Sequence, residues 1–307
     1  MPEIAFVSTS SSRQQLVRRA TYAAVVVAAF LVLGKSFAWY ITGSLSIQAS
    51  LVDSLLDTGA SLINFIAVRH ALKPADAEHR FGHGKAEALA SLGQSLLIAL
   101  SSLWLMREVL YRSYHPTEVL FSALAIFIMA ISTVLTLFLV MGQRYVIKKT
   151  QSLAIAADSL HYQTDILTNI GVLASFAVST YFNFFYLDTL VGAVIAVYIF
   201  YTSWQIAKKS FDILMDRELP DETLAIIRQL AQNHPQVLGI HDLRTRSSGH
   251  NEFIQMHLDL EASLTLDEAH CIAQDIAMKI YRVFPNAEVI IHQDPVGISS
   301  SHCQHPA

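Results

Sequence analysis

Charged residues and cysteines are both scarce in this 307-residue sequence. Asp, Glu, Lys and Arg together make up 15% of it, whereas hydrophobic residues make up 53%. This balance is typical of membrane proteins rather than of soluble ones. The two cysteines, Cys271 and Cys303, build no disulfide framework and fit a reducing compartment. The formal net charge of −4 points to no polyanionic partner, so nucleic acid is not an expected ligand.

Motifs of ATP-driven and zinc-proteolytic chemistry are also missing. The sequence has no G-x-x-x-x-G-K-[ST] loop, no D-K-T-G segment and no H-E-x-x-H pair. These motifs would hold nucleotide phosphates, an aspartyl phosphate and a catalytic zinc ion. Their absence argues against an ATP-driven pump and a zinc protease, and we expect no enzyme.

Long apolar runs fill the first two thirds of the chain. Six runs are each long enough to cross about 30 Å of hydrocarbon as a helix. They cover residues 20–41, 45–70, 87–111, 117–142, 152–181 and 187–208. The first run lacks an A-x-A cleavage site at its end, so we interpret it as an uncleaved anchor. The sequence predicts a cytoplasmic N-terminal segment at 1–19 and a six-helix transmembrane domain at 20–211.

Positive charge is unevenly distributed over the connections between these runs. Lys and Arg cluster between the second and third runs, between the fourth and fifth, and after the sixth. The turns near 42–46 and 182–188 have none, although Arg107 and Arg112 lie near the turn between the third and fourth runs. Because cytoplasmic loops carry the excess of Lys and Arg, both termini are expected to be cytoplasmic.

From about residue 212 the sequence resembles that of a soluble domain. Asp221 can cap a first amphipathic helix, and Thr265 with Glu268 forms a capping box that opens a second one. The segments VLGIHDLRTR, NEFIQMHLDLE and AEVIIHQD are expected to be strands. The order α-β-β-α-β predicts a small α+β domain at 212–295 with helices on one sheet face, then a flexible tail at 296–307.

Two of the predicted membrane helices carry acidic residues and a histidine. Asp53 and Asp57 are four residues apart on one helix, and His161 and Asp165 are four apart on another, so each pair shares a helix face. An ionised Asp at mid-membrane costs about 2.5 to 3.5 kcal/mol, so two on one helix call for a cation. If the helices pack together, the four side chains suit Zn²⁺ or Fe²⁺ better than Mg²⁺ or Ca²⁺.

A buried polar network between helices is the structural alternative for these residues. Such networks usually use Ser, Thr, Asn or Gln rather than three carboxylates, so we favour the ion site. Asp158 lies one turn away on the same face, and its position favours a capping or entrance residue over a ligand.

Two further groups of histidines have weaker metal-binding patterns. Asp76, His79 and His83 fall within eight residues of a loop, where Zn²⁺ binding and a solvated loop without a specific role fit the spacing equally well. In the soluble domain, His241 and His257 can meet Asp294 if their strands are neighbours, but lone surface histidines are usually only polar. The tail residues His302, Cys303 and His305 could chelate metal, although a disordered end is favoured.

Five strings in this sequence resemble those of the cation diffusion facilitators. They are RFGHGKAE, ADSLHYQTD, LMDRELP, HDLRTR and EVIIHQDP, and the similarity covers nearly the whole chain. The resemblance implies a homodimer in the bacterial inner membrane that binds Zn²⁺, with Cd²⁺ or Fe²⁺ also accepted. It also implies a ferredoxin-like, metallochaperone-like fold for the cytoplasmic domain.

The resemblance further implies roles for individual positions. The intramembrane transport site would consist of Asp53, Asp57, His161 and Asp165. A loop site would consist of Asp76, His79 and His83. A cytoplasmic site for two metal ions, with Asp294 bridging them, would consist of His241, His257, His270, His292 and Asp294. A charged interlock between the two subunits of the dimer would consist of Lys85 and Asp216.

The leading functional hypothesis is exchange of a divalent metal ion for protons by alternating access. Metal binding needs a neutral imidazole and ionised carboxylates, so protonation expels the metal. The alternatives are a pump dedicated to ferrous iron, a passive metal channel, an intramembrane aspartyl protease and a metal sensor anchored in the membrane. Tight binding slows release and disfavours the channel.

Overall fold

The structure, a computed structural model, leaves short gaps in the chain that it describes. Its described backbone comprises residues 3–42, 45–114, 123–182, 186–249 and 251–296. Side chains near several helix ends, and that of Asp53, lie outside the described part.

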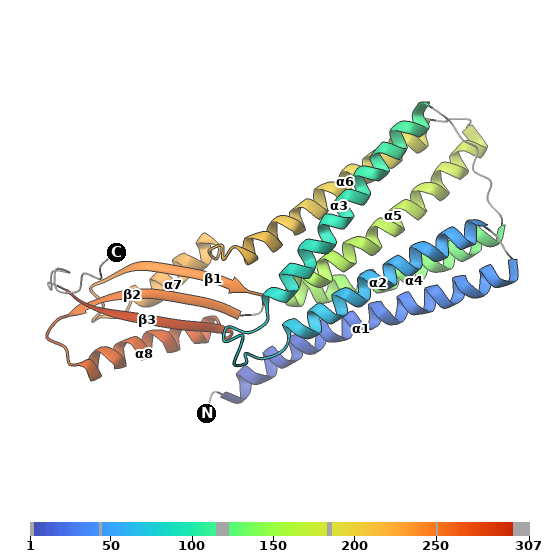
Figure 1. The fold of residues 1–307 in the computed structure, drawn as a ribbon. Helices are drawn as coiled ribbons and strands as arrows, with labels where there is room; N and C mark the ends of the chain where they lie inside the picture. The colour runs from blue at the N-terminus through green and yellow to red at the C-terminus, as the bar shows by residue number, and fades with distance from the viewer. Residues whose placement is uncertain (1–2, 43–44, 115–122, 183–185, 250, 297–307) are drawn as a thin grey trace. The chain divides into compact units, whose positions relative to one another are not determined.

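Six long helices are followed by two short helices and three strands in the described residues. The helices of the first part are α1 (Glu3–Thr42), α2 (Leu45–Ala71), α3 (Lys85–Tyr114), α4 (Ala123–Thr150), α5 (Leu153–Phe182) and α6 (Tyr186–Leu214). The second part contains α7 (Asp221–Gln232), β1 (Gly239–Ser248), β2 (Asn251–Glu261), α8 (Leu266–Val283) and β3 (Ala287–Val296) (Figure 1). The chain divides into two compact units: Val7–Phe211, called here the helical unit, and Asp212–Ala307 together with Met1–Phe6, called here the C-terminal unit.

Helix α5 is the element that the rest of the helical unit packs around. It contacts α2, α3 and α4. Its Ile155 packs in a buried cluster with residues of α1, α2 and α4, and its Leu160 packs with Ile98 of α3 and Ile199 of α6. At the first turn of α5, the Glu87 carboxylate accepts hydrogen bonds from the Ser152 hydroxyl and from the Ala154 amide. Side chains on α5 can therefore meet partners from several helices.

The outward faces of the helical unit are apolar. Leu97, Trp104 and Phe138 are each at least 65% exposed, as expected of side chains that face lipid. In the part of the chain that the structure describes, three helical segments are long and apolar enough to span a membrane: Ser12–Ile41, Lys85–Tyr111 and Phe127–Thr150. Helices α2, α5 and α6 have 27, 30 and 29 residues, a length that is also sufficient to cross a bilayer.

The C-terminal unit is a three-stranded sheet covered by helices on one face. Its strand order is β1-β2-β3, with β1 antiparallel and β3 parallel to β2. The even-numbered residues of β2, from Ile254 to Leu260, pack in one core with Ile227 of α7 and Ile276 of α8. Because side chains alternate along a strand, His257 and Asp259 lie on the opposite face, away from the helices. The predicted α-β-β-α-β order and the helical membrane domain are confirmed.

Some predicted element ends were wrong. Helix α1 begins at Glu3, before residue 20, and its Val17 packs in a buried cluster with residues of α2, α4 and α5. Asp221 is the first residue of α7 rather than its cap: Pro220 occupies the cap position, and no side chain caps the helix. The capping box of α8 is present as predicted, with Thr265 and Glu268 bonded reciprocally.

Glu268→Gln is expected to lower the melting temperature of the protein at pH 7 but not at about pH 3. The backbone N–H and the hydroxyl of Thr265 donate to the Glu268 carboxylate at 2.9 and 2.8 Å, and they hold the pKa of Glu268 below its usual range. This stabilisation is present above the unfolded pKa of about 4.3 and is lost as the pH falls through the folded pKa. Asp267→Asn, in the same turn, is the control for loss of a charge. Equal destabilisation by Glu268→Gln at both pH values would contradict the prediction.

Candidate metal centres

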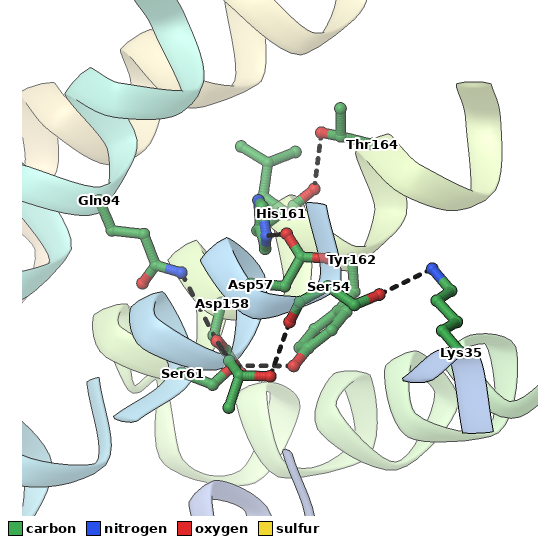
Figure 2. Close-up of polar contacts among 11 residues, drawn as sticks. Lys35, Ser54, Asp57, Ser61, Gln94, Asp158, His161, Tyr162 and Thr164 are labelled. Carbon is green, nitrogen blue, oxygen red and sulfur yellow. Dashed lines mark hydrogen bonds and ion pairs between the residues drawn. The ribbon is translucent and has the colours of Figure 1, made fainter. Parts of the chain in front are cut away.

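The side chains of α2 and α5 meet in a cluster inside the helical unit. The His161 Nε2 atom lies 2.8 Å from Oδ1 of Asp57 (Figure 2), and both side chains are 23% exposed. Asp57, His161 and Asp165 each offer a ligand atom, and these atoms lie within 4.8 Å of one another. Asp53 is on α2, one turn before Asp57, but its side chain lies outside the described residues. The structure thus brings together three of the four predicted residues and leaves the fourth undescribed.

A lysine from α1 lies beside this part of α2. Lys35 Nζ donates to the Ser54 hydroxyl at 2.7 Å, and Ser54 directly follows Asp53 in the sequence (Figure 2). The sequence alone did not connect α1 with this site, because Lys35 and Ser54 are 19 residues apart on different helices.

The loop between α2 and α3 folds its own carboxylate against two histidines. Asp76 lies 3.4 Å from Nδ1 of His79 and 3.3 Å from Nε2 of His83. The backbone amides of His79 and Glu78 donate to Asp76, and the bond from His79 in particular holds the pKa of this carboxyl below its usual range. Gly82 adopts a φ of 79°, which an L residue with a side chain rarely does. The ligand atoms of Asp76, His79 and His83 all lie within 4.8 Å of one another.

His70, in the last turn of α2, lies beside the loop cluster and was not predicted. Its ring centroid is 4.7 Å from that of His83, at an interplanar angle of 84°. The His83 side chain is 4% exposed, and its Nδ1 has no hydrogen-bond partner in the structure. His70 lies on α2, six residues before Asp76. The spacing of residues within the loop therefore gives no sign that His70 is close to His83.

Three histidines form a row across the polar face of the C-terminal sheet. His257 is paired with His241 of β1 and with His292 of β3. Asp294 lies 3.3 Å from Nε2 of His241, 2.7 Å from Nδ1 of His257 and 3.2 Å from Nε2 of His292. The ligand atoms of His241, His257 and Asp294 also lie within 4.8 Å of one another. Asp294 is therefore the carboxylate on which the three imidazoles converge.

A second acidic residue, Asp259, adjoins this row and was not predicted. Its Oδ1 lies 3.2 Å from Nδ1 of His241. A Cβ placed on Gly239, which is paired with Asp259, would come within 2.3 Å of that carboxylate, so the absence of a side chain at Gly239 leaves room for Asp259. The strand register also shifts between His241 and Arg244, where Asp242 has a φ of 48°. Such an irregularity changes the direction of side chains on an edge strand, and sequence alternation does not reveal it.

Other predicted site residues are not brought into these groups. His270 is exposed on α8, which packs on the opposite face of the sheet from the histidine row, so it does not join the row within one chain. Lys85 and Asp216 belong to different compact units, and Asp216 lies 3.4 Å from Arg246 in its own unit. The tail residues His302, Cys303 and His305 lie outside the described part of the chain.

Two family models match this chain, one over each part. Residues 21–215 match the family model described as the cation efflux transmembrane domain. Residues 219–296 match the model described as the cation efflux protein, cytoplasmic domain. The chain belongs to the cation efflux family.

Members of this family from enteric bacteria are similar over almost the full length. The cation-efflux pump FieF of Shigella boydii serotype 18 is 43% identical over 289 residues, which are 94% of this chain and 96% of that protein. FieF of Escherichia fergusonii is 44% identical over the same shares of the two chains. FieF of Citrobacter koseri is 45% identical over 92% of this chain and 94% of its own.

Membership of the cation efflux family confirms the predicted resemblance and the broad function. The protein is a transporter rather than an enzyme, which removes the intramembrane protease alternative. It is a membrane protein of the bacterial inner membrane. Carboxylates and imidazoles are ligands of metal cations, and groups of them occur in both units, as expected of a cation efflux protein.

His70→Ala is expected to weaken Zn²⁺ binding at the loop cluster about tenfold. A histidine beside a ligand fixes its orientation or adds a donor, and loss of such a neighbour typically costs ten- to a hundredfold in affinity. The measurement is competition of the purified protein against a chelating dye. His234→Ala, which removes a histidine of the C-terminal unit, is the control. Binding by His70→Ala equal to that of the control would show that His70 only packs against His83.

Proposed function

We propose that this protein exports a divalent metal ion, Zn²⁺ in the first place, from the cytoplasm in exchange for protons. The observation that carries the proposal is the meeting of Asp57, His161 and Asp165 between helices whose outer surfaces are apolar. Carboxylates and an imidazole in such a place are costly without a cation. They suit Zn²⁺, and Cd²⁺ or Fe²⁺ can share the same ligands, so a pump dedicated to ferrous iron is the alternative.

Competition between metal and protons follows from the chemistry of these ligands. His161 binds a metal ion as the neutral imidazole, and Asp57 and Asp165 bind it as carboxylates. Loading from the cytoplasm therefore releases protons, and protons that enter from the outside displace the metal. Because these groups interact closely, the binding and release of protons are properties of the whole cluster and not of one residue. Rocking of the helices would expose the cluster to each side in turn.

The remaining predicted residues have supporting roles in this proposal. Asp53 supplies the fourth ligand from α2, and the loop cluster binds a second metal ion. The histidine row with Asp294 binds two ions on the cytoplasmic side and stabilises a homodimer. His270 would reach such a site from a second copy of the chain, since α8 covers the opposite sheet face within one chain. Lys85 and Asp216 form the interlock of that dimer, and both termini are cytoplasmic.

Transport assays in sealed vesicles test the proposal. The purified protein is reconstituted with a zinc indicator inside the vesicles, and a pH gradient is imposed across the membrane. We expect zinc uptake that rises when the vesicle interior is acidic and that is accompanied by proton efflux. Uptake that is indifferent to the gradient would refute proton exchange, and absence of zinc uptake together with iron uptake would favour the ferrous-iron pump.

His161→Asp is expected to shift the preference of transport from Zn²⁺ toward harder ions such as Mn²⁺. The substitution replaces the one nitrogen ligand of the described cluster by oxygen, and all-oxygen sites favour harder cations. The measurement is the ratio of Zn²⁺ to Mn²⁺ uptake in the same vesicles. An unchanged ratio would show that this ligand set does not act as the selectivity filter.

A further inference from the structure

Asp158 is a carboxylate that the metal clusters do not use. It lies on α5, one turn before His161, and it is 1% exposed. Its contacts come from three other helices. The Ser61 hydroxyl lies 3.2 Å from its Oδ1, and Gln94 Nε2 lies 3.5 Å from the same oxygen (Figure 2). Gln143 Nε2 lies 2.7 Å from its Oδ2. Both carboxylate oxygens of Asp158 therefore accept hydrogen bonds from side chains of other helices inside the helical unit.

All of these partners are neutral. Among the side chains that the structure describes, no Lys, Arg or His lies within ion-pair distance of Asp158. Hydrogen bonds from amides and hydroxyls orient a carboxylate but do not cancel its charge, and a buried charge is costly without a counter-charge. A proton on Asp158 would remove this cost.

The glutamine side chains fit both the ionised and the protonated form of Asp158. Gln143 is 2% exposed, and its Oε1 has no hydrogen-bond partner; the same holds for the buried Oε1 of Gln94. Rotation of a glutamine amide by 180° exchanges the positions of its NH2 group, which donates, and its carbonyl oxygen, which accepts. The ionised carboxylate accepts from the amide nitrogen, and the protonated form can donate to the carbonyl that is now without a partner.

A pair of hydroxyls links Asp158 to the neighbourhood of the metal cluster. Ser61 Oγ lies 2.7 Å from the Tyr162 hydroxyl. An ionised Asp158 can only accept, so Ser61 donates to it and Tyr162 donates to Ser61. Tyr162 directly follows His161 in the sequence, and their ring centroids are 5.7 Å apart.

The ligand chemistry around Asp158 does not suit a transition metal ion. Within the described residues, Asp158 belongs to none of the groups of carboxylates and imidazoles whose ligand atoms lie close together. Its neighbours are amide and hydroxyl groups, whereas Zn²⁺ and related ions select imidazole, thiolate and carboxylate ligands. The titratable or charged groups on the helices around it include Asp57 on α2, Glu87 on α3, Arg144 on α4, and His161, Tyr162 and Asp165 on α5.

We propose that Asp158, with Ser61, Gln94 and Gln143, is a proton-binding site separate from the metal ligands, and that its proton is one of those exchanged for metal. The carboxyl takes up one proton from the outward-facing side and releases it on the cytoplasmic side, while metal moves the other way. The inference rests on the proposed exchange of metal for protons.

Asp158→Asn in the full-length protein tests the inference, because an amide keeps the shape of the carboxyl group but does not titrate at these pH values, and its N–H group can donate to a glutamine carbonyl. In vesicles that report both zinc and pH, we expect unchanged zinc affinity and about one proton fewer per zinc ion, since one titratable carboxyl is gone. Asn64→Leu, which removes another buried polar contact between α2 and α5, is the matched control. It should retain the wild-type proton count.

Each outcome bears on the inference in a defined way. A wild-type proton count in Asp158→Asn would overturn it, as would loss of zinc affinity to the same degree in Asp158→Asn and Asn64→Leu, which would indicate a structural network. If Asp158→Asn does not fold, Asp158→Glu must keep proton exchange with a shifted pH midpoint; an unshifted midpoint would overturn the inference. Wild-type protein that moves zinc without protons would refute the proposed function itself.

Discussion

Changing Asp57 to alanine is expected to reduce zinc transport by at least about a hundredfold. Removal of a direct ligand costs more than the ten- to hundredfold that is typical of neighbours of a ligand. Asp57 is also the carboxylate that lies 2.8 Å from the His161 ring, so its loss removes the partner that orients this imidazole. The measurement is the initial rate of zinc uptake by vesicles that contain equal amounts of folded protein.

Leu56 provides a matched control for this experiment. It is adjacent to Asp57 on α2 but is 69% exposed on the apolar outer surface. Leu56→Ala should therefore transport zinc at close to the wild-type rate. If folded Asp57→Ala protein kept more than about a third of wild-type transport, the cluster between α2 and α5 would not be the transport site.

Changing Asp294 to alanine is expected to remove metal from the C-terminal unit, with a loss of affinity of about a hundredfold or more. Three imidazoles, those of His241, His257 and His292, lie within 3.3 Å of this carboxylate. Without Asp294, the site would lose one negative charge and the oxygen that bridges the ions, and only the three neutral rings would remain as ligands from this row. The measurement is the number of zinc ions per chain by mass spectrometry after dialysis against a weak chelator.

The helical unit offers an internal check on the Asp294 result. Its cluster belongs to a different compact unit, so the zinc that depends on Asp57 should remain bound in Asp294→Ala. Glu288→Ala, at an exposed position on the same strand, should leave the metal content unchanged. An unchanged zinc count in Asp294→Ala would mean that the histidine row is only a polar surface.

The candidate transport site illustrates how far sequence reasoning reaches. The spacing of His161 and Asp165 places both on one face of a helix, because the helical period is a property of the backbone. The same argument applied to Asp158 gave only an entrance or capping residue. Its contacts with Ser61 and Gln94 span 97 and 64 residues of sequence, and they arise from helix packing that no local pattern encodes.

The C-terminal unit shows the same limit in a sheet. Strand alternation places His257 on the opposite face of its strand from Met256 and Leu258, and in the structure these two residues pack in the core while His257 faces away from it. The pairing of His241 with His257 depends on register, which is set by strand partners and by the shift next to Asp242. His270 was grouped with the row by resemblance, whereas the packing of α8 places it elsewhere within one chain.

The sequence by itself determined that the protein crosses a membrane, that it belongs to a metal-transporting family, and which side chains share a face of each element. The membrane crossing and the shared faces follow from composition and from the short periods of the helix and the strand, whereas the family follows from sequence strings that resemble its members. The tertiary structure alone decided that α2 meets α5 at Asp57 and His161, that three strands align their histidines, and that Asp158 lies in a neutral buried shell. Such contacts depend on how distant elements pack, and packing is a property of the whole chain.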